Sequence, residues 1–277
     1  MPFRAVVFDL DGVLYRGGEL CPGAAEGLAA VREDGLDVLF MTNNASRTPD
    51  QVAEHLTSLG IDAKREEVLN SSQVGAAHLA QLRDDQDTPG SGEDPLVLAV
   101  GGPGVAAALR EEGFSCLPAA EVPESGPPRP FWAVLQGYGP QMKVHDLHEV
   151  AYALHDGAIW VATNADSTLP TSRGLAPGNG ALLAAVTHGT GLNPEVVGKP
   201  FPRSYGIALD RLGLGAADVL AVGDRLDTDI EGARAAGLSS ALVLTGVHGR
   251  SDVDAAPAQR RPDVVVDHIP DLREHWR

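Results

Sequence analysis

The chain has 277 residues, which suggests about two domains, and a formal net charge of −17 from 21 basic and 38 acidic residues. So acidic a surface repels phosphate backbones and anionic lipids, which argues against nucleic acid and membranes as partners. Its two cysteines argue against a disulfide framework or a cysteine-built zinc site. The N-terminal apolar run is too short for a signal peptide, and no run approaches a membrane span, so we expect a soluble cytoplasmic protein.

The predicted elements alternate between strands and helices. Short, continuous apolar runs are typical of strands that are covered on both faces in a parallel sheet. Helix signals lie between them, such as Pro49 at a first helical position and Gly60 at a helix end. This order predicts an α/β fold, a doubly wound and mostly parallel sheet with a Rossmann-like core. The expected strands span 5–8, 38–41, 96–100, 131–135, 159–162, 219–222, 241–244 and 264–266, and the expected helices span 24–34, 48–60, 105–112 and 230–236.

The composition changes clearly once, at residues 84–94. This stretch is polar, contains glycine and proline, and has no periodicity, so it is a loop or an inter-domain connection. We expect residues 1–84 and 189–277 to form one domain together, and residues 85–188 to form an inserted α/β domain.

Two acidic residues, Asp9 and Asp11, directly follow the first predicted strand. Residues two apart project to the same side of an extended chain, so both carboxylates would converge at the strand's carboxyl end. At about 4 Å such a pair repels by about 4 kcal/mol at an effective dielectric constant near 20. It therefore calls for a cation, a shared proton or solvent exposure, although a simple turn with aspartate caps is an alternative.

Two further strands end in polar groups. Thr42, Asn43 and Asn44 follow the strand at 38–41, where a hydroxyl and main-chain N–H groups can hold an anionic oxygen or cap a turn. Lys199 lies between a glycine and a proline in a chain with only three lysines, so a specific role and a solvated surface position are equal alternatives for it.

A third acidic group follows the strand at 219–222. Asp227 and Asp229 have a structural interpretation as residues of a first helical turn. Asp224 precedes that helix and follows a glycine, so this interpretation does not apply to it. Carboxylates from separate strand ends make an all-oxygen site that favours Mg²⁺ over Ca²⁺.

Parallel strands bring their carboxyl ends to one edge of the sheet, so all of these groups would meet there. Their chemistry is complementary. A nucleophilic carboxylate, a second carboxyl group, a metal and a lysine are the equipment for phosphoryl transfer through an aspartyl-phosphate.

The four motifs resemble, in order, those of the haloacid dehalogenase-like superfamily. The stretches that carry the resemblance are 9–14 (DLDGVL), 42–44 (TNN), 198–200 (GKP) and 223–230 (GDRLDTDI), and 162–180 resembles the cap of the type IIA branch. That branch contains 4-nitrophenylphosphatase-like, phosphoglycolate and pyridoxal-phosphate phosphatases.

The resemblance implies catalytic roles for four residues. Asp9 would attack phosphorus, and Asp11 would protonate the leaving oxygen and then activate water. Thr42 would hold the phosphoryl oxygens, and Lys199 would neutralise the nucleophile and the phosphate.

It also implies a metal site and a substrate site. Mg²⁺ would be held by Asp9, the main-chain carbonyl of Asp11 and Asp224, with Asp229 in support. Gly12, Asn43 and Asn44 would contact the substrate, whereas Arg173 and Asn179 would either contact the leaving group or bond the backbone.

The cap departs from the family pattern at residues 136–139, where an apolar strand usually ends in Gly-Leu-Asp and this chain has Gln-Gly-Tyr-Gly. Because the cap closes over the leaving group in this branch, the change puts an inherited substrate identity in doubt.

We therefore expect Mg²⁺-dependent hydrolysis of a small phosphate monoester through an aspartyl-phosphate on Asp9. A phosphomutase or phosphotransferase with the same intermediate is an alternative, as is a phospho-accepting regulatory switch, which would have little use for a cap. The expected partner is a small phosphorylated metabolite, with a homodimer as a possible assembly.

Overall fold

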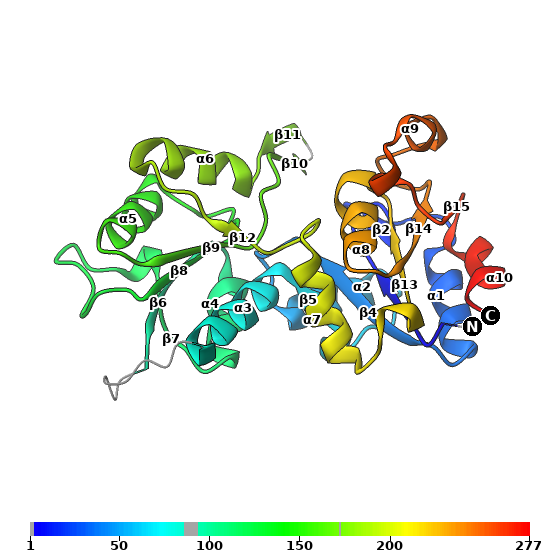
Figure 1. Ribbon diagram of the computed structural model, residues 1–277, viewed down its shortest axis with the longest axis horizontal. Coiled ribbons are helices and arrows are strands. Elements are labelled where there is room, and N and C mark those ends of the chain that lie inside the picture. The colour runs from blue at the N-terminus through cyan, green and yellow to red at the C-terminus, as the bar shows by residue number, and fades with distance from the viewer. Residues whose placement is uncertain (1–2, 86–93, 172) are drawn as a thin grey trace. The chain divides into compact units, whose positions relative to one another are not determined.

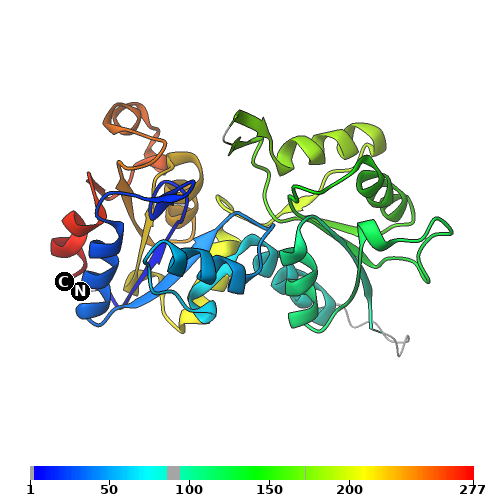
Figure 2. The same cartoon turned by 180° about the vertical axis from the view of Figure 1, so that it is seen from behind.

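A computed structural model of the chain describes residues 3–85, 94–171 and 173–277, and these fall into two compact units (Figures 1 and 2). The first unit contains the chain as far as Thr42, together with Pro49–Leu69 and Lys199–Arg277. The second contains Asn43–Thr48 and Asn70–Gly198.

The first unit is built on a six-stranded sheet in the order β15-β14-β13-β1-β4-β5. The chain starts at the centre with β1, continues outward through β4 and β5, and later returns through β13, β14 and β15 on the other side. Consecutive pairs from β15 to β4 are parallel. The strands are β1 (Ala5–Phe8), β4 (Asp37–Thr42), β5 (Val68–Asn70), β13 (Val219–Gly223), β14 (Ser239–Val243) and β15 (Val264–Val266).

Helices cover both faces of this sheet. One face packs Val6, Phe8 and Phe40 against Leu28 of α1 (Ala24–Glu33) and Leu56 of α2 (Pro49–Ser58), and the short helix α10 (Arg273–Trp276) joins this core. The other face carries α7 (Pro202–Leu212) and α8 (Glu231–Ala235). The remaining elements are a hairpin of β2 (Tyr15–Arg16) and β3 (Glu19–Leu20), and α9 (Arg250–Ala255).

The second unit is built on a separate, wholly parallel sheet in the order β12-β9-β8-β6-β7. Its apolar core packs Leu98, Val134 and Ala162 against α5 and α6. Its strands are β6 (Leu96–Val100), β7 (Ser115–Pro118), β8 (Ala133–Gln136), β9 (Ile159–Ala162) and β12 (Glu195–Val196), with a hairpin of β10 (Thr168–Thr171) and β11 (Gly174–Pro177). Its helices are α3 (Ser71–Asp85), α4 (Pro103–Glu111), α5 (Val144–His155) and α6 (Asn179–Thr190).

The predicted α/β class and the parallel sheet are confirmed, and each of the eight expected strands is present. The units divide at other residues than the expected 84/85 and 188/189. The second unit starts earlier because α3 packs against β8 and β9, and it ends later because β12 pairs with β9. Most of the expected connection at 84–94 lies outside the described residues. Within them, no helix is long and apolar enough to cross a membrane.

Candidate active site

Three neighbouring strands of the first sheet end in polar residues. Asp9 follows β1, Thr42 ends β4 and Asp224 follows β13. Pairing with β13 continues past β1, because the main-chain N–H of Asp9 donates to the carbonyl of Val222 at 2.9 Å. The chain changes its direction across the sheet at β1, and ligands of open α/β sheets bind outside the carboxyl ends at such a point.

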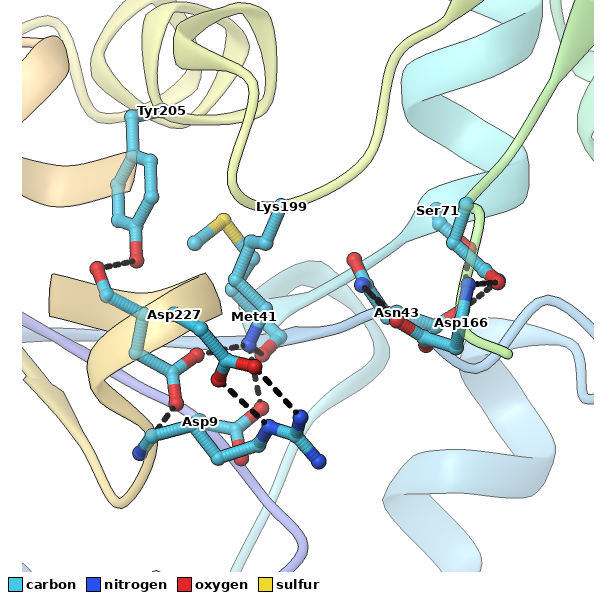
Figure 3. Close-up of polar contacts among 11 residues, drawn as sticks. Asp9, Met41, Asn43, Ser71, Asp166, Lys199, Tyr205 and Asp227 are labelled. Atoms are coloured by element: carbon cyan, nitrogen blue, oxygen red, sulfur yellow. Dashed lines mark hydrogen bonds and ion pairs between the residues drawn. The ribbon is translucent and has the colours of Figure 1, made fainter. Parts of the chain in front are cut away.

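Lys199 connects these strand ends (Figure 3). Its ammonium donates to Asp9 Oδ1 at 2.5 Å, to Asp229 Oδ1 at 2.7 Å and to the carbonyl of Met41 at 3.3 Å. The side chain is 4% exposed. Burial alone would lower the pKa of Lys199, but the charges of Asp229 and Asp9 outweigh burial and raise it well above its usual value. Lys199 is therefore a fixed positive charge beside the carboxylate of Asp9.

Asp229 is held from two sides in the helical turn Leu226–Ile230. Its Oδ2 accepts the main-chain N–H of Arg225 at 3.1 Å, which leaves Oδ1 for Lys199. The hydroxyl of buried Tyr205 donates to the main-chain carbonyl of Asp229 at 2.9 Å. These contacts fix the direction in which Asp229 points toward the lysine.

Asp224 is almost completely buried, with 1% exposure. Its Oδ2 accepts the main-chain N–H of Val247 at 2.7 Å, whereas its Oδ1 has no hydrogen-bond partner among the residues that the structure describes. The carboxylate lies so close to the backbones of Gly12 and Gly246 that neither position has room for a Cβ atom. A buried carboxylate oxygen with no donor is costly unless a cation or a water satisfies it.

The charges of the cluster do not balance. Asp9, Asp224 and Asp229 each offer an oxygen within 4.8 Å of the others, and when all three are ionised the ammonium of Lys199 leaves the cluster with a net charge of −2. Burial raises the pKa of Asp9 well above its usual value and that of Asp224 to about 7, where the charge of Asp229 adds to the effect. An all-oxygen set with excess negative charge and an unsatisfied buried oxygen fits a divalent cation such as Mg²⁺.

Asp11 lies in the turn that follows β1 and is exposed. The turn is closed by Gly12, whose φ is +86° and whose N–H donates to the carbonyl of Tyr15 at 2.8 Å. Thr42 is buried, with 6% exposure. Asp11 thus faces solvent two residues after Asp9, whereas Thr42 does not.

Asn43 and Asn44, which follow Thr42, belong to the second unit. The amide of Asn43 lies 3.4 Å from a carboxylate oxygen of Asp166, and its main-chain carbonyl accepts the hydroxyl of Ser71 at 2.6 Å (Figure 3). The side chain of Asn44 accepts both the N–H and the hydroxyl of Ser46. The side chain of Asn44 therefore caps a turn, which is one of the two alternatives that the sequence left open.

Arg173 and Asn179 also lie in the second unit, in different surroundings. Arg173 is exposed in the turn just before β11, and its N–H donates to the hydroxyl of Thr171 at 3.2 Å. Asn179 is 1% exposed, and its amide donates to the main-chain carbonyls of Asn164 at 2.8 Å and Gln136 at 3.4 Å. For Asn179 the structure favours the alternative in which it bonds the backbone.

The departure from the family pattern at 136–139 has a local explanation. Gln136 is fully buried, and its side-chain oxygen accepts the indole N–H of Trp160 at 3.2 Å. A Cβ atom at Gly139 would collide with the backbone of Gly101 and Gly102. An aspartate therefore does not fit at Gly139 in this conformation.

Sequence reasoning missed two contributors to the site, Tyr205 and the main-chain N–H of Val247. The second leaves a faint signal, because Val247 lies just after a predicted strand, where the other site groups also lie. Tyr205 leaves none, since a tyrosine in an amphipathic helix is usually core. Asp227 forms an ion pair with Arg225 at 3.0 Å, is partly exposed, and lies in the first turn of the helical segment Leu226–Ile230, in agreement with its interpretation as a residue of a first helical turn.

Comparisons with known proteins agree on one family. A family model described as haloacid dehalogenase-like hydrolase matches residues 6–115, and one described as HAD-hydrolase-like matches residues 196–272. The chain is 43% identical over 269 residues to a D-glycerol 3-phosphate phosphatase of Mycobacterium tuberculosis, covering 97% of this chain and 70% of the relative. It is 34% identical over 251 residues to an acid sugar phosphatase of Staphylococcus aureus, covering 91% and 90%.

Solved structures of phosphatases are also similar to this chain. A glycerol phosphate phosphatase of M. tuberculosis in complex with magnesium has a TM-score of 0.86 at 42% identity, covering 98% of this chain and 76% of that one. A p-nitrophenyl phosphatase of Archaeoglobus fulgidus has a TM-score of 0.85 at 28% identity, covering 99% and 100%.

Proposed function

Because this chain belongs to the type IIA branch of the haloacid dehalogenase-like hydrolases and is a phosphatase, we propose that it hydrolyses a small phosphate monoester by way of an aspartyl-phosphate on Asp9, with Mg²⁺ as cofactor. The observation that carries this proposal is the contact between Asp9 and Lys199 within a cluster of three carboxylates.

Asp9 is the nucleophile. A carboxylate attacks phosphorus only when the negative charges of the two groups are compensated, and Lys199 lies 2.5 Å from its Oδ1. Asp229 accepts from the same ammonium and so keeps it in place in the first unit. The bond from Asp9 Oδ to phosphorus forms as the bond from phosphorus to the ester oxygen breaks.

Asp11 moves the proton. Its exposed carboxyl group gives a proton to the leaving ester oxygen, then takes one from the water that hydrolyses the acyl phosphate and regenerates Asp9. Thr42 and the main-chain N–H groups that follow it hold the phosphoryl oxygens.

Asp9, the main-chain carbonyl of Asp11 and Asp224 would hold Mg²⁺, with Asp229 in support. The unsatisfied Oδ1 of Asp224 supports this assignment, because a buried carboxylate oxygen of this kind is a ready ligand. When bound, the cation supplies positive charge that neutralises the phosphate and orients it toward the nucleophile.

The substrate we propose is a small phosphorylated polyol or sugar. This follows the relatives named D-glycerol 3-phosphate phosphatase and acid sugar phosphatase. We propose that the second unit is the cap, that Gly12, Asn43 and Asn44 line the phosphate side, and that Arg173 meets the leaving group. A cap of that size limits the substrate to small molecules, which agrees with a net charge of −17 that disfavours nucleic acid.

The test is hydrolysis of 4-nitrophenyl phosphate by the Asp9→Asn variant. We expect a loss of at least about a thousandfold in kcat, since the amide cannot form the acyl phosphate. Asp37→Asn, an exposed aspartate at the start of β4, is the matched control and should keep full activity. EDTA should abolish turnover, and added Mg²⁺ should restore it.

The intermediate is tested separately by acid-quenching the enzyme with a radiolabelled substrate. The wild type should carry a hydroxylamine-sensitive label that Asp9→Asn lacks. Normal turnover by Asp9→Asn, or a label that persists in it, would refute the assigned nucleophile.

A further inference from the structure

The segment that follows β14, residues 245–248, joins the two loops that carry the acidic groups. We call it the 245–248 loop. At one end the hydroxyl of Thr245 donates to the carbonyl of Gly12 at 2.7 Å, in the turn after β1. In the middle the N–H of Val247 donates to Asp224 Oδ2 at 2.7 Å. One short segment therefore fixes Asp224 relative to the turn that follows Asp9.

His248 makes two further contacts in the 245–248 loop. Its main-chain N–H donates to the carbonyl of Asp224 at 3.2 Å, and its ring Nδ1 accepts the N–H of Leu226 at 3.1 Å. Leu226 opens the helical turn that contains Asp229, and the first N–H groups of a helical segment have no acceptor within it. The imidazole supplies that acceptor and so holds the start of the helical turn that follows Asp224.

The packing around Asp224 leaves its carboxylate little room to take another position. Its carboxylate is enclosed by the backbones of Gly12 and Gly246, and a Cβ atom at either would collide with it. A shift of the 245–248 loop would therefore move the Asp224 carboxylate or break its hydrogen bond to Val247.

We propose that His248 is a positioning residue for Asp224: by accepting the Leu226 N–H at Nδ1, it sets the direction in which the unsatisfied Oδ1 of Asp224 points, and thereby the affinity of the site for Mg²⁺. This inference rests on the proposed function, in which Asp224 holds the cation. Groups that orient metal ligands without touching the metal typically change metal affinity or activity by about 10–100-fold when removed.

The chemistry of the contact selects the test variants. The side-chain oxygen of asparagine sits at the same number of bonds from the backbone as Nδ1, so His248→Asn keeps an acceptor for Leu226. His248→Gln moves its amide one carbon further out, and His248→Leu has no acceptor at all. His275→Leu, which alters an exposed histidine of the first unit, is the matched control.

The experiment is calorimetric titration of Mg²⁺ into each metal-free protein, with Tm measured in EDTA. We expect Kd for Mg²⁺ to rise about tenfold in His248→Leu and His248→Gln. It should rise less than threefold in His248→Asn and not at all in His275→Leu. If His248 served only the stability of the fold, Tm in EDTA would fall equally in His248→Asn and His248→Gln. The two variants would then not differ in Kd for Mg²⁺.

Two results would overturn the inference. One is unchanged Mg²⁺ affinity in all three His248 variants, and the other is an equal loss in all three, which would show that the Nδ1 acceptor is not what matters. If His248→Leu fails to fold, the comparison of asparagine with glutamine still decides. Asp224→Asn separates the two proposals: undiminished Mg²⁺ binding there refutes the assigned metal ligand, whereas lost binding there with normal binding in His248→Leu refutes only the role of His248.

Discussion

Both units are built on a parallel sheet with helices, yet the carboxyl edges of their central strands carry different chemistry. In the first unit Lys199 lies among the carboxylates of Asp9 and Asp229. In the second, the polar residues Gln136 at the end of β8 and Asn164 just after β9 are neutral, and they make hydrogen bonds to an indole and to backbone. A parallel sheet thus provides a place for a site, and the residue types at its strand ends decide whether one forms.

The two edges also differ in how far their polar groups are satisfied. At the neutral edge the amide of Asn179 joins the main-chain carbonyls of Asn164 and Gln136 within its own unit. At the charged edge, three carboxylates lie close together, the ammonium of Lys199 bonds two of them, and a buried oxygen of Asp224 has no donor among the described residues. A net charge held in the interior is costly without a ligand, so the first edge is built to receive a cation and the second is not.

Among the variants that test this contrast, Lys199→Met should have the largest effect, because it removes the positive charge from the first edge and keeps the length of the side chain. We expect kcat to fall about 100–1,000-fold, the typical loss when one group that stabilises developing charge is deleted. The protein without metal should lose about 3–5 kcal/mol of unfolding free energy, because Asp9 and Asp229 stay buried without a counter-ion. Phosphatase assays and denaturant titration measure the two.

Lys64→Met, at an exposed lysine of the first unit, is the control for that experiment and should change neither quantity. Wild-type kcat in Lys199→Met would show that the charge at the first edge does not contribute to turnover, and would contradict the prediction.

Asn179→Ala at the second edge should have a smaller effect, which is confined to stability. The variant leaves the carbonyls of Asn164 and Gln136 without this donor in a buried place, which should cost about 1–3 kcal/mol of unfolding free energy. Because no charge is removed, kcat should stay within about threefold of wild type. Asn193→Ala, at an exposed asparagine of the same unit, should stay within about 0.5 kcal/mol of wild type. A large loss of kcat with normal stability would instead assign Asn179 to the substrate.

The contrast between the edges was only partly visible in the sequence. The strands and the acidic groups after them could be predicted because apolar runs and the residues that end them are local signals. The contacts of Tyr205 and Asn179 could not, since each depends on a partner brought close by the fold. The start of a segment of the second unit at Asn70 depends on the fold in a related way: α3 packs against β8 and β9, while its own sequence carries no sign of the sheet that it covers.

An aspartate at the opposite edge of the first sheet, Asp34, has different surroundings from the aspartates of the site. Asp34 ends α1 shortly before β4 begins, and its carboxylate accepts from the guanidinium groups of Arg273 and Arg277 and from the indole of Trp276. The hydrogen bonds from Arg277 and Arg273 lower the pKa of Asp34 well below its usual value. This aspartate therefore has its partners within the protein and should act on stability alone.

The smallest predicted effect is accordingly that of Asp34→Asn, a fall in Tm at neutral pH with unchanged kcat. A carboxyl group with a depressed pKa in the folded state stabilises that state above its unfolded pKa, near 4, and the stabilisation is lost as pH falls toward the folded value. The Tm difference between wild type and Asp34→Asn should thus be constant from pH 8 to about 5 and shrink from about pH 4 downward. Thermal unfolding at a series of pH values measures it. A difference that grows on acidification would mean that Asp34 is not held as an ionised acceptor, and the contrast between the two ends of the sheet would fail.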